Sequence, residues 1–271
     1  MSEIAGRHIL VTGGASGIGR LMAKKLAALG GRLSVWDIQR ENLDKVVAEL
    51  NAAAREPAHG FLCDVSKREN VYRVAEETKA AGGAVDILIN NAGVVSGKRI
   101  VETPDEKIEA TFAVNTLSLF WTAKAFLPQM IEHNRGHVVT IASASSLIGV
   151  AKLADYAASK WAAMAFDESL RAELRQDAPD VMTTVVCPFY IDTGMFKGVK
   201  SRFPILLPIL KEDYVAERIV GAIRGNKRRL MIPPLVYTIP SMRLLPVGAF
   251  DWLATFLGVN ASMDQFKGRG A

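Results

Sequence analysis

The chain has 271 residues, of which 49% are hydrophobic and 23% charged, with a formal net charge of +5. This balance is typical of a soluble globular protein and excludes a disordered chain. The positive excess is too small for a nucleic-acid-binding surface, so we expect no nucleic-acid partner. The sequence shows no signal peptide and no uninterrupted apolar stretch of about 18 residues, which predicts a cytoplasmic protein without a membrane-spanning helix.

Short β-branched segments alternate with longer amphipathic ones. We expect strands at 8–11, 32–36, 61–63 (the end of a third), 85–89, 137–142 and 182–186, and a short apolar run at 230–232. Helices are expected at 18–29, 41–54, 67–81, 104–132, 155–176 and 212–224, with Pro128 kinking or ending the long fourth one. Such alternation predicts a parallel sheet covered by helices on both faces.

A glycine-rich turn, residues 12–19 (TGGASGIG), joins the first strand to the first helix. Gly13 permits a tight turn, Gly17 lets the backbone approach a pyrophosphate, and Gly19 lets the helix pack closely on the sheet. The start of the helix offers N–H groups to the anion, so we expect cofactor contacts from Gly13, Ser16, Gly17, Ile18 and Gly19. A glycine turn without a ligand is the disfavoured alternative, because glycine is costly in a plain turn.

Acidic residues follow the second and third strands. Asp37 can accept hydrogen bonds from both ribose hydroxyls of adenosine and would repel a 2′-phosphate, which predicts NAD rather than NADP. Arg40 is close enough in sequence to weaken that repulsion, and a helix-capping or surface aspartate is the alternative. We expect Asp64 and Val65 to meet the adenine edge; Asp64 could also cap the next helix.

Two further motifs are Asn90-Asn91-Ala92-Gly93 and Tyr156-Ala157-Ala158-Ser159-Lys160. With the glycine turn, Asn115 and Ser143, they stand in the order and spacing of the short-chain dehydrogenase/reductase family, which the chain resembles over nearly its whole length. Segments 140–143, 187–196 and 256–264 resemble the branch of epidermal retinol dehydrogenases and lipid-droplet hydroxysteroid dehydrogenases. The resemblance implies an α/β fold, a single Rossmann-type doubly wound domain over residues 1–271. Its mainly parallel seven-stranded sheet would have the order 3-2-1-4-5-6-7, with helices on both faces.

The resemblance implies an NAD(H)-dependent oxidoreductase that interconverts a lipophilic secondary or allylic alcohol, retinol-like or steroid-like, and its carbonyl compound. Tyr156 and Lys160 are four residues apart, hence on one helix face. A phenol is a poor base at its ordinary pKa near 10, and we expect the ammonium and an oxidised nicotinamide to lower it. Ser143 would hydrogen-bond the substrate oxygen, with Ser145 and Ser146 as competing candidates.

Asn115 stands inside the long helix, where we expect it to open the helix locally, hold a water and link Lys160 to solvent; a satisfied core asparagine is the alternative. The resemblance places further cofactor contacts at Asn91, Ala92, Gly93, Tyr156, Lys160, Pro188, Ile191 and Thr193. We expect no metal site, because His133 and His137, although four apart, have no third ligand nearby.

After about residue 195 the chain becomes apolar, irregular and punctuated by proline. We expect 193–211 to form a substrate lid and 230–271 a C-terminal apolar appendage of the same domain. The appendage could be a pocket wall, an oligomer contact or a membrane-surface patch, and we favour a pocket wall with a shallow peripheral membrane contact. The family resemblance also implies a homodimer or homotetramer, built on the long fourth helix and the Tyr156 helix.

Two other functions remain open from the sequence. One is an NADPH-dependent ketoacyl-type reductase, which Asp37 argues against. The other is a non-catalytic nucleotide-binding scaffold, which the complete set of Ser143, Tyr156 and Lys160 argues against.

Overall fold

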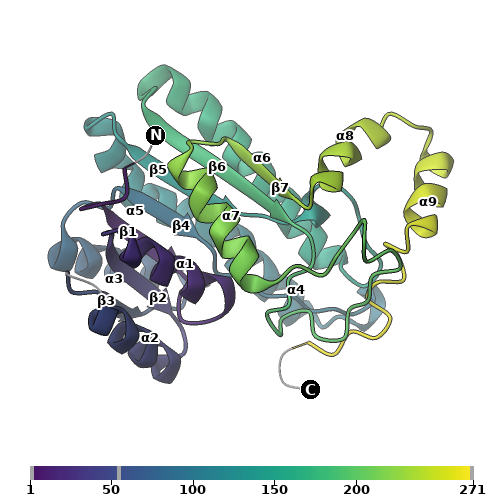
Figure 1. Ribbon diagram of the computed structural model, residues 1–271, viewed down its shortest axis with the longest axis horizontal. Helices are drawn as coiled ribbons and strands as arrows, with labels where there is room; N and C mark the ends of the chain where they lie inside the picture. The colour runs from purple at the N-terminus through teal and green to yellow at the C-terminus, as the bar shows by residue number, and fades with distance from the viewer. Residues whose placement is uncertain (1–2, 54–55, 269–271) are drawn as a thin grey trace.

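A seven-stranded, all-parallel sheet forms the centre of the part of the chain that the computed structural model describes, residues 3–53 and 56–268 (Figure 1). Its order is β3-β2-β1-β4-β5-β6-β7. The strands are β1 His8–Thr12, β2 Arg32–Asp37, β3 His59–Leu62, β4 Ile87–Asn90, β5 Gly136–Ile141, β6 Val181–Pro188 and β7 Arg229–Ile232. The predicted fold class and strand order are confirmed. The order reverses between β1 and β4, and ligands bind at such a point in open α/β sheets.

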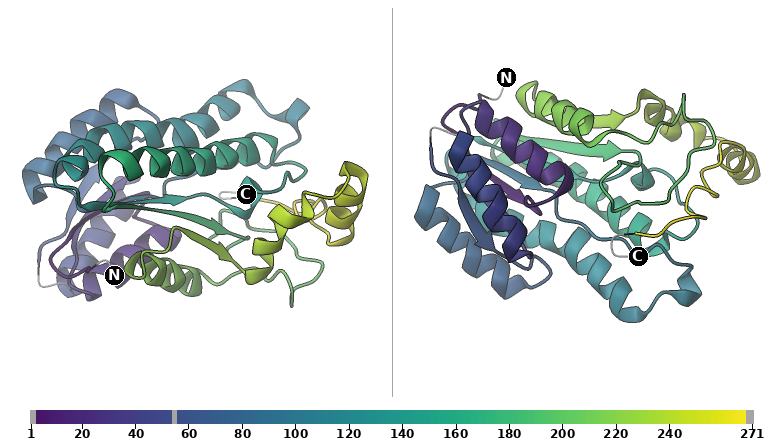
Figure 2. Two further views of the ribbon diagram at one scale, coloured as in Figure 1. Left: turned by 90° about the horizontal axis from the view of Figure 1, so that it is seen from above. Right: turned by 60° about the horizontal axis from the view of Figure 1, so that its bottom comes forward.

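Helices cover both faces of the sheet (Figure 2). Within β1, Ile9 and Val11 pack in one apolar cluster with α1, α2 and α7, whereas Leu10 packs in another with α3, α5 and α6. This alternation follows from the two-residue period of a strand. The helices are α1 Gly17–Ala28, α2 Arg40–Ala53, α3 Arg68–Gly82, α4 Asp105–Phe112, α5 Ser118–Glu132, α6 Ala154–Asp177 and α7 Glu212–Arg224.

Most predicted element ends agree with the structure to within one to three residues, and Ala54, the predicted last residue of the second helix, lies outside the described residues. The long fourth helix divides into α4 and α5 around a π-helical turn, Ala113–Leu117. Pro128 does not end the helix, because α5 continues to Glu132. At this position, within the last turns of α5, proline removes one N–H donor without reversing the direction of the chain.

The appendage is more regular than the sequence predicted. After β7 come a 3-10 helix Pro234–Thr238, helix α8 Ile239–Met242 and helix α9 Val247–Phe256 (Figure 1). Pro234 and Pro240 lie in the first turns of their helices, and Pro246 directly precedes α9. Proline is favoured at helix starts, so these residues initiate short helices where we had predicted irregular chain.

Among the described residues, no helix combines the length and the apolar character needed to cross a bilayer.

Candidate active site

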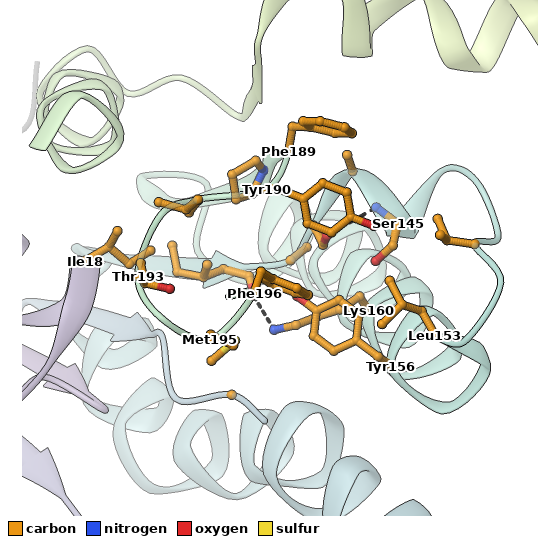
Figure 3. A pocket seen from close by; sticks show the side chains of 18 of the residues that line it. Ile18, Ser145, Leu153, Tyr156, Lys160, Phe189, Tyr190, Thr193, Met195 and Phe196 are labelled. Atoms are coloured by element: carbon orange, nitrogen blue, oxygen red, sulfur yellow. Dashed lines mark hydrogen bonds between the residues drawn. The ribbon is translucent and has the colours of Figure 1, made fainter. Parts of the chain in front are cut away.

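A cavity of about 460 Å³ opens at the carboxyl edge of the sheet (Figure 3). Residues after β1, β2 and β3 line it on one side of the point where the strand order reverses, and residues after β4, β5, β6 and β7 on the other. The lining includes every residue predicted to contact the cofactor, namely Gly13, Ser16, Gly17, Ile18, Gly19, Asp37, Asp64, Val65, Asn91, Ala92, Gly93, Tyr156, Lys160, Pro188, Ile191 and Thr193. Ser143 also lines the cavity, whereas Asn115 does not.

Gly13 and Gly19 of the glycine turn have no room for a side chain. Gly13 and Gly17 have φ angles of +60° and +51°, in the left-handed region that favours glycine. A Cβ at Gly13 would lie 2.9 Å from the Ala92 Cα, and one at Gly19 would overlap the Gly13 carbonyl oxygen. The turn is therefore a backbone cradle beside the start of α1, where N–H groups attract an anion.

The Asn-Asn-Ala-Gly segment is fastened to this cradle. The Asn91 side-chain amide donates to the carbonyl oxygens of Thr12 and Gly13, both at 3.0 Å. In return, the Thr12 hydroxyl accepts the N–H groups of Asn91 and Ala92 at 3.0 and 3.1 Å. These bonds fix the end of β4 relative to the end of β1, across the point where the strand order reverses.

The Asp37 carboxylate is 9% exposed and held by the backbone. Its Oδ2 accepts the Ala15 N–H and its Oδ1 accepts the Gln39 N–H, each at 3.0 Å. Arg40, which the sequence suggested as a neighbouring charge, instead lies 3.7 Å from Asp44 on the exposed side of α2. Arg40 is thus paired with Asp44 and not with Asp37, which lines the cavity.

Asp64 does not cap α3, whose N-cap residue is Lys67. Its Oδ1 accepts the N–H of Ser66 at 2.9 Å and the Ser66 hydroxyl at 2.6 Å, which closes a local turn. The Asp64 N–H donates to Asn70 Oδ1 at 2.7 Å. The capping alternative is therefore wrong, because three residues separate Asp64 from the first helical residue.

Tyr156 and Lys160 lie in the first two turns of α6 with side chains buried at the cavity (Figure 3). Lys160 Nζ donates to the Ile141 carbonyl oxygen at 2.8 Å and lies 5.8 Å from the centroid of the Tyr156 ring. Burial lowers the pKa of Lys160 to about 8, so the amine is still mostly charged at pH 7.

Burial also raises the pKa of the Tyr156 phenol, and a hydrogen bond with the Ser143 hydroxyl only partly opposes this. We predicted that the Lys160 ammonium and an oxidised nicotinamide together lower this pKa; the protein's own groups by themselves raise it. The physical cause is that the charge of Lys160 is directed at Ile141, whereas the phenol is enclosed by apolar side chains.

The three serines after β5 have different surroundings. Ser143 caps the 3-10 helix Ala144–Ser146, and its Oγ accepts the Ser145 N–H at 3.2 Å. The Ser146 hydroxyl accepts the Ser143 N–H at 3.2 Å and does not line the cavity. The Ser145 hydroxyl is buried and has no hydrogen-bond partner among the described residues. Of the three serines, Ser143 is the one whose side chain acts on the pKa of Tyr156, which it lowers.

Asn115 lies in the π-helical turn, as a locally opened helix requires. Its amide donates to the Val94 carbonyl oxygen at 2.9 Å and to Ser159 Oγ at 3.0 Å, and its Oδ1 accepts the Val94 N–H at 2.9 Å. A Cβ at Gly93 would lie 3.4 Å from Asn115 Oδ1 and 3.5 Å from Lys160 Nζ. Asn115 is thus a hydrogen-bonded core residue near Lys160; the water link stays a prediction.

From the sequence we expected a lid at residues 193–211 and favoured a pocket wall at 230–271, but we named no individual residue of the apolar lining. That lining includes Ile148, Val150, Leu153, Tyr190, Phe196, Leu207, Leu235, Ile239, Met242, Phe250, Leu253 and Leu257. One signal was available, since Phe250, Leu253, Ala254 and Leu257 have the spacing of a single helix face. Tyr190 and Phe196 had no such signal, because they lie in a segment without regular structure.

His133 and His137, which we did not expect to bind a metal, differ in burial. His137 is buried on β5 with Nε2 2.7 Å from the Thr184 hydroxyl, whereas His133 ends α5 at the surface. Among the described residues, no three His, Cys, Asp or Glu side chains are grouped to hold a metal ion.

Comparison with known proteins gives a consistent family match. Residues 7–202 match the family described as short chain dehydrogenase. Epidermal retinol dehydrogenase 2 of Homo sapiens is 44% identical over 266 residues, covering 97% of this chain and 86% of that protein. Retinol dehydrogenase 10 of Rattus norvegicus is 40% identical over 292 residues, covering 97% and 86%.

Solved structures agree. A short chain dehydrogenase/reductase from Burkholderia phymatum in complex with NAD has a TM-score of 0.81 at 27% identity, covering 90% of this chain and 95% of that one. A metagenomic short-chain oxidoreductase in complex with NADP has a TM-score of 0.71 at 30% identity, covering 85% and 98%.

Proposed function

Since the chain belongs to the short chain dehydrogenase family, and is an oxidoreductase that acts on CH–OH groups with a nicotinamide cofactor, we propose its finer chemistry. It is an NAD(H)-dependent enzyme that interconverts a lipophilic secondary or allylic alcohol and its carbonyl compound, with Tyr156 as the proton donor and acceptor. One observation carries the proposal: Ser143, Tyr156 and Lys160 line the same cavity as the glycine turn and Asp37.

The residues present fit a nicotinamide dinucleotide. The turn between β1 and α1 can pack this closely against the residues after β4 because Gly13 and Gly19 lack Cβ atoms, and it borders the N–H groups at the start of α1. Each Asp37 oxygen accepts one backbone N–H and retains a lone pair for a ribose hydroxyl. Its charge disfavours a 2′-phosphate, which supports NAD over NADP. The nicotinamide, when bound, supplies or accepts the hydride.

The protein's own groups handle the proton. The Tyr156 hydroxyl donates its proton to the carbonyl oxygen in reduction and takes the hydroxyl proton in oxidation. Ser143, already hydrogen-bonded to Tyr156, stabilises charge on the same substrate oxygen. Lys160 uses one hydrogen on Ile141 and has two left for ribose hydroxyls. Asn115 would support the exchange of protons between Lys160 and solvent.

The substrate class follows from the apolar lining. Side chains from the lid segment, residues 193–211, and from the appendage, residues 230–271, wall the cavity beyond Tyr156. Leu207, Ile239, Phe250 and Leu253 offer no charge to a ligand there, which favours a bulky apolar alcohol. The names of the retinol dehydrogenase relatives fit this chemistry.

Two exposed apolar surfaces support the proposed partners. Leu117 and Phe120, at the start of α5, and Trp161 on α6 are partly exposed and would be covered in a homodimer or homotetramer. Light scattering should give a mass of two or four chains; a mass of one chain would contradict this.

The second surface lies on the appendage. Around α8 and α9, Leu244, Val247 and Trp252 are 88%, 77% and 67% exposed. Other residues of the same two helices, among them Ile239, Phe250 and Leu253, line the cavity. This arrangement favours a peripheral contact with a membrane surface, from which an apolar substrate would enter.

Replacing Tyr156 with phenylalanine tests the proposed function. Tyr156→Phe keeps the ring and its packing but removes the proton, so turnover of apolar alcohols should fall by at least about two orders of magnitude while NAD affinity stays unchanged. Absorbance at 340 nm measures turnover, and quenching of intrinsic fluorescence measures binding. Tyr214→Phe, at an exposed tyrosine of α7, is the matched control.

Near-normal turnover in Tyr156→Phe would remove Tyr156 from the mechanism. NAD binding by the unaltered protein without turnover on any alcohol or ketone would instead support the scaffold alternative.

A further inference from the structure

The last described residues lie across the lid segment. We call residues 259–267 the C-terminal strap. Two backbone hydrogen bonds join strap and lid: the Lys200 N–H donates to the Ser262 carbonyl oxygen at 3.2 Å, and the Lys267 N–H donates to the Lys197 carbonyl oxygen at 2.8 Å. In Figures 1 and 2 the strap, in yellow, runs beside the lid, in green. The residues that these bonds join are more than 60 positions apart in sequence, so only the fold brings them together.

Their approach is close enough to require glycine. At Gly198 φ is +90°, and a Cβ there would overlap the Gln265 carbonyl oxygen. At Gly97 φ is +68°, and a Cβ would overlap the Phe266 ring. Gly194, also in the lid, has φ +77° but nothing within 4 Å of its Cβ position. The contact with the strap, as well as the backbone conformation, therefore excludes a side chain at position 198.

The Phe196 ring of the lid packs between the strap and Tyr156. The Phe196 ring is edge-on to Tyr156, at 5.7 Å between centroids and 80°, and to Tyr190, at 5.1 Å and 68°. On its strap side it meets Phe266 at 6.4 Å. Met263 of the strap is fully buried in the same apolar cluster as Tyr156. Phe196 is thus held between the strap and the proposed proton donor.

The strap also accepts a hydrogen bond from the other phenol in the cavity, that of Tyr190. Ser262 Oγ donates to the Val259 carbonyl oxygen at 2.6 Å, so its single hydrogen is used. The Tyr190 hydroxyl, 2.9 Å away, must therefore donate to Ser262 Oγ. Two buried tyrosines line the cavity, but only Tyr156 keeps its proton available to a substrate.

We propose that the C-terminal strap holds the lid closed, that Phe196 thereby acts as a positioning residue for Tyr156, and that substrate enters when strap and lid move away together. The strap is fixed at its outer side by an ion pair between Lys152 and Asp264 at 2.9 Å, which is partly exposed and easily broken. This inference rests on the proposed role of Tyr156 as the proton donor and acceptor.

Gly198→Ala and Gly194→Ala form a matched pair that tests it. Both place alanine at a positive φ angle in the lid, so both carry similar backbone strain, but only Gly198→Ala meets the strap. In Gly198→Ala, amide hydrogen exchange in residues 260–267 should be at least about tenfold faster than in Gly194→Ala. The kcat for a bulky apolar alcohol should fall about tenfold, with the KM for NAD unchanged.

The pH profile separates positioning from a general loss of structure. Releasing the lid exposes Tyr156 to water and removes part of the burial that raises its pKa. The midpoint of kcat/KM assigned to Tyr156 should therefore move to lower pH in Gly198→Ala and stay in place in Gly194→Ala. Ser262→Ala, which keeps the backbone bonds but loses the Tyr190 contact, should show a smaller shift in the same direction and serves if Gly198→Ala does not fold.

Equal exchange rates and equal pH midpoints in the two glycine variants would overturn the proposal. Hydrogen exchange does not depend on catalysis, so it tests the strap even if the unaltered protein turns over no alcohol. Absence of turnover in the unaltered protein would count against the proposed function alone.

Discussion

Removing the Asp37 carboxylate should change which cofactor the protein prefers. Asp37 is held by two backbone N–H groups and faces the cavity, and Arg40 is occupied with Asp44 rather than with Asp37. A 2′-phosphate near a ribose-binding carboxylate would meet an uncompensated like charge. In Asp37→Ala that repulsion disappears, together with the hydrogen bonds to the ribose hydroxyls.

The size of the effect follows from the charges. Two unit charges about 5 Å apart interact by about 3 kcal/mol at an effective dielectric constant near 20, and this corresponds to about two orders of magnitude in relative affinity. A lost hydrogen bond to a charged acceptor costs NAD about 1.5–3 kcal/mol more. The ratio of kcat/KM for NAD to that for NADP should therefore fall at least about 100-fold.

Initial rates at 340 nm with each cofactor, on one apolar alcohol, measure this ratio. Asp44→Ala is the control, because it removes the same charge from the exposed face of α2 without touching the cavity. Asp37→Ala loses the acceptor of the Ala15 and Gln39 N–H groups, so its melting temperature must be checked first. A ratio that changes less than about threefold would refute the role given to Asp37 and the reasoning from charge.

Two more predictions concern stability and the membrane. Burial raises the pKa of Asp167 from 3.8 to about 7, so the folded state binds a proton that the unfolded state releases, and stability falls as pH rises from about 4 to 7. In denaturant unfolding, the free energy of unfolding of the unaltered protein should fall by up to about 4 kcal/mol over that range, and this fall should be absent in Asp167→Asn. If the free energy of unfolding changes with pH equally in both proteins, the buried Asp167 is not its cause. For the membrane surface, combined replacement of Leu244, Val247 and Trp252 by serine should abolish flotation with phosphatidylserine-containing vesicles, whereas Val101→Ser, at an equally exposed apolar residue elsewhere, should not. If the unaltered protein fails to float, or the triple variant floats equally well, the membrane contact is wrong.

Much of the fold and the cofactor end of the site could be predicted because their signals are local. The residues between β1 and α1 are adjacent in sequence, and Gly13 and Gly17 have the positive φ angles that such a turn requires. Tyr156 and Lys160 share a face of α6 because of the helical period. Asp37 reaches the same edge because every strand of a parallel sheet ends there.

Tertiary structure alone decided the surroundings of these groups. Tyr156 is enclosed by Phe196, forty residues further along the chain, and by Met263, more than one hundred further, so its pKa rises where the Lys160 spacing predicted a fall. Asn115 forms its hydrogen bonds with Val94 and Ser159, from two other segments. Spacing along a chain fixes which side chains share an edge or a face. Burial and hydrogen-bond partners depend on segments that meet only after folding, and these set the charge state and the access of the site.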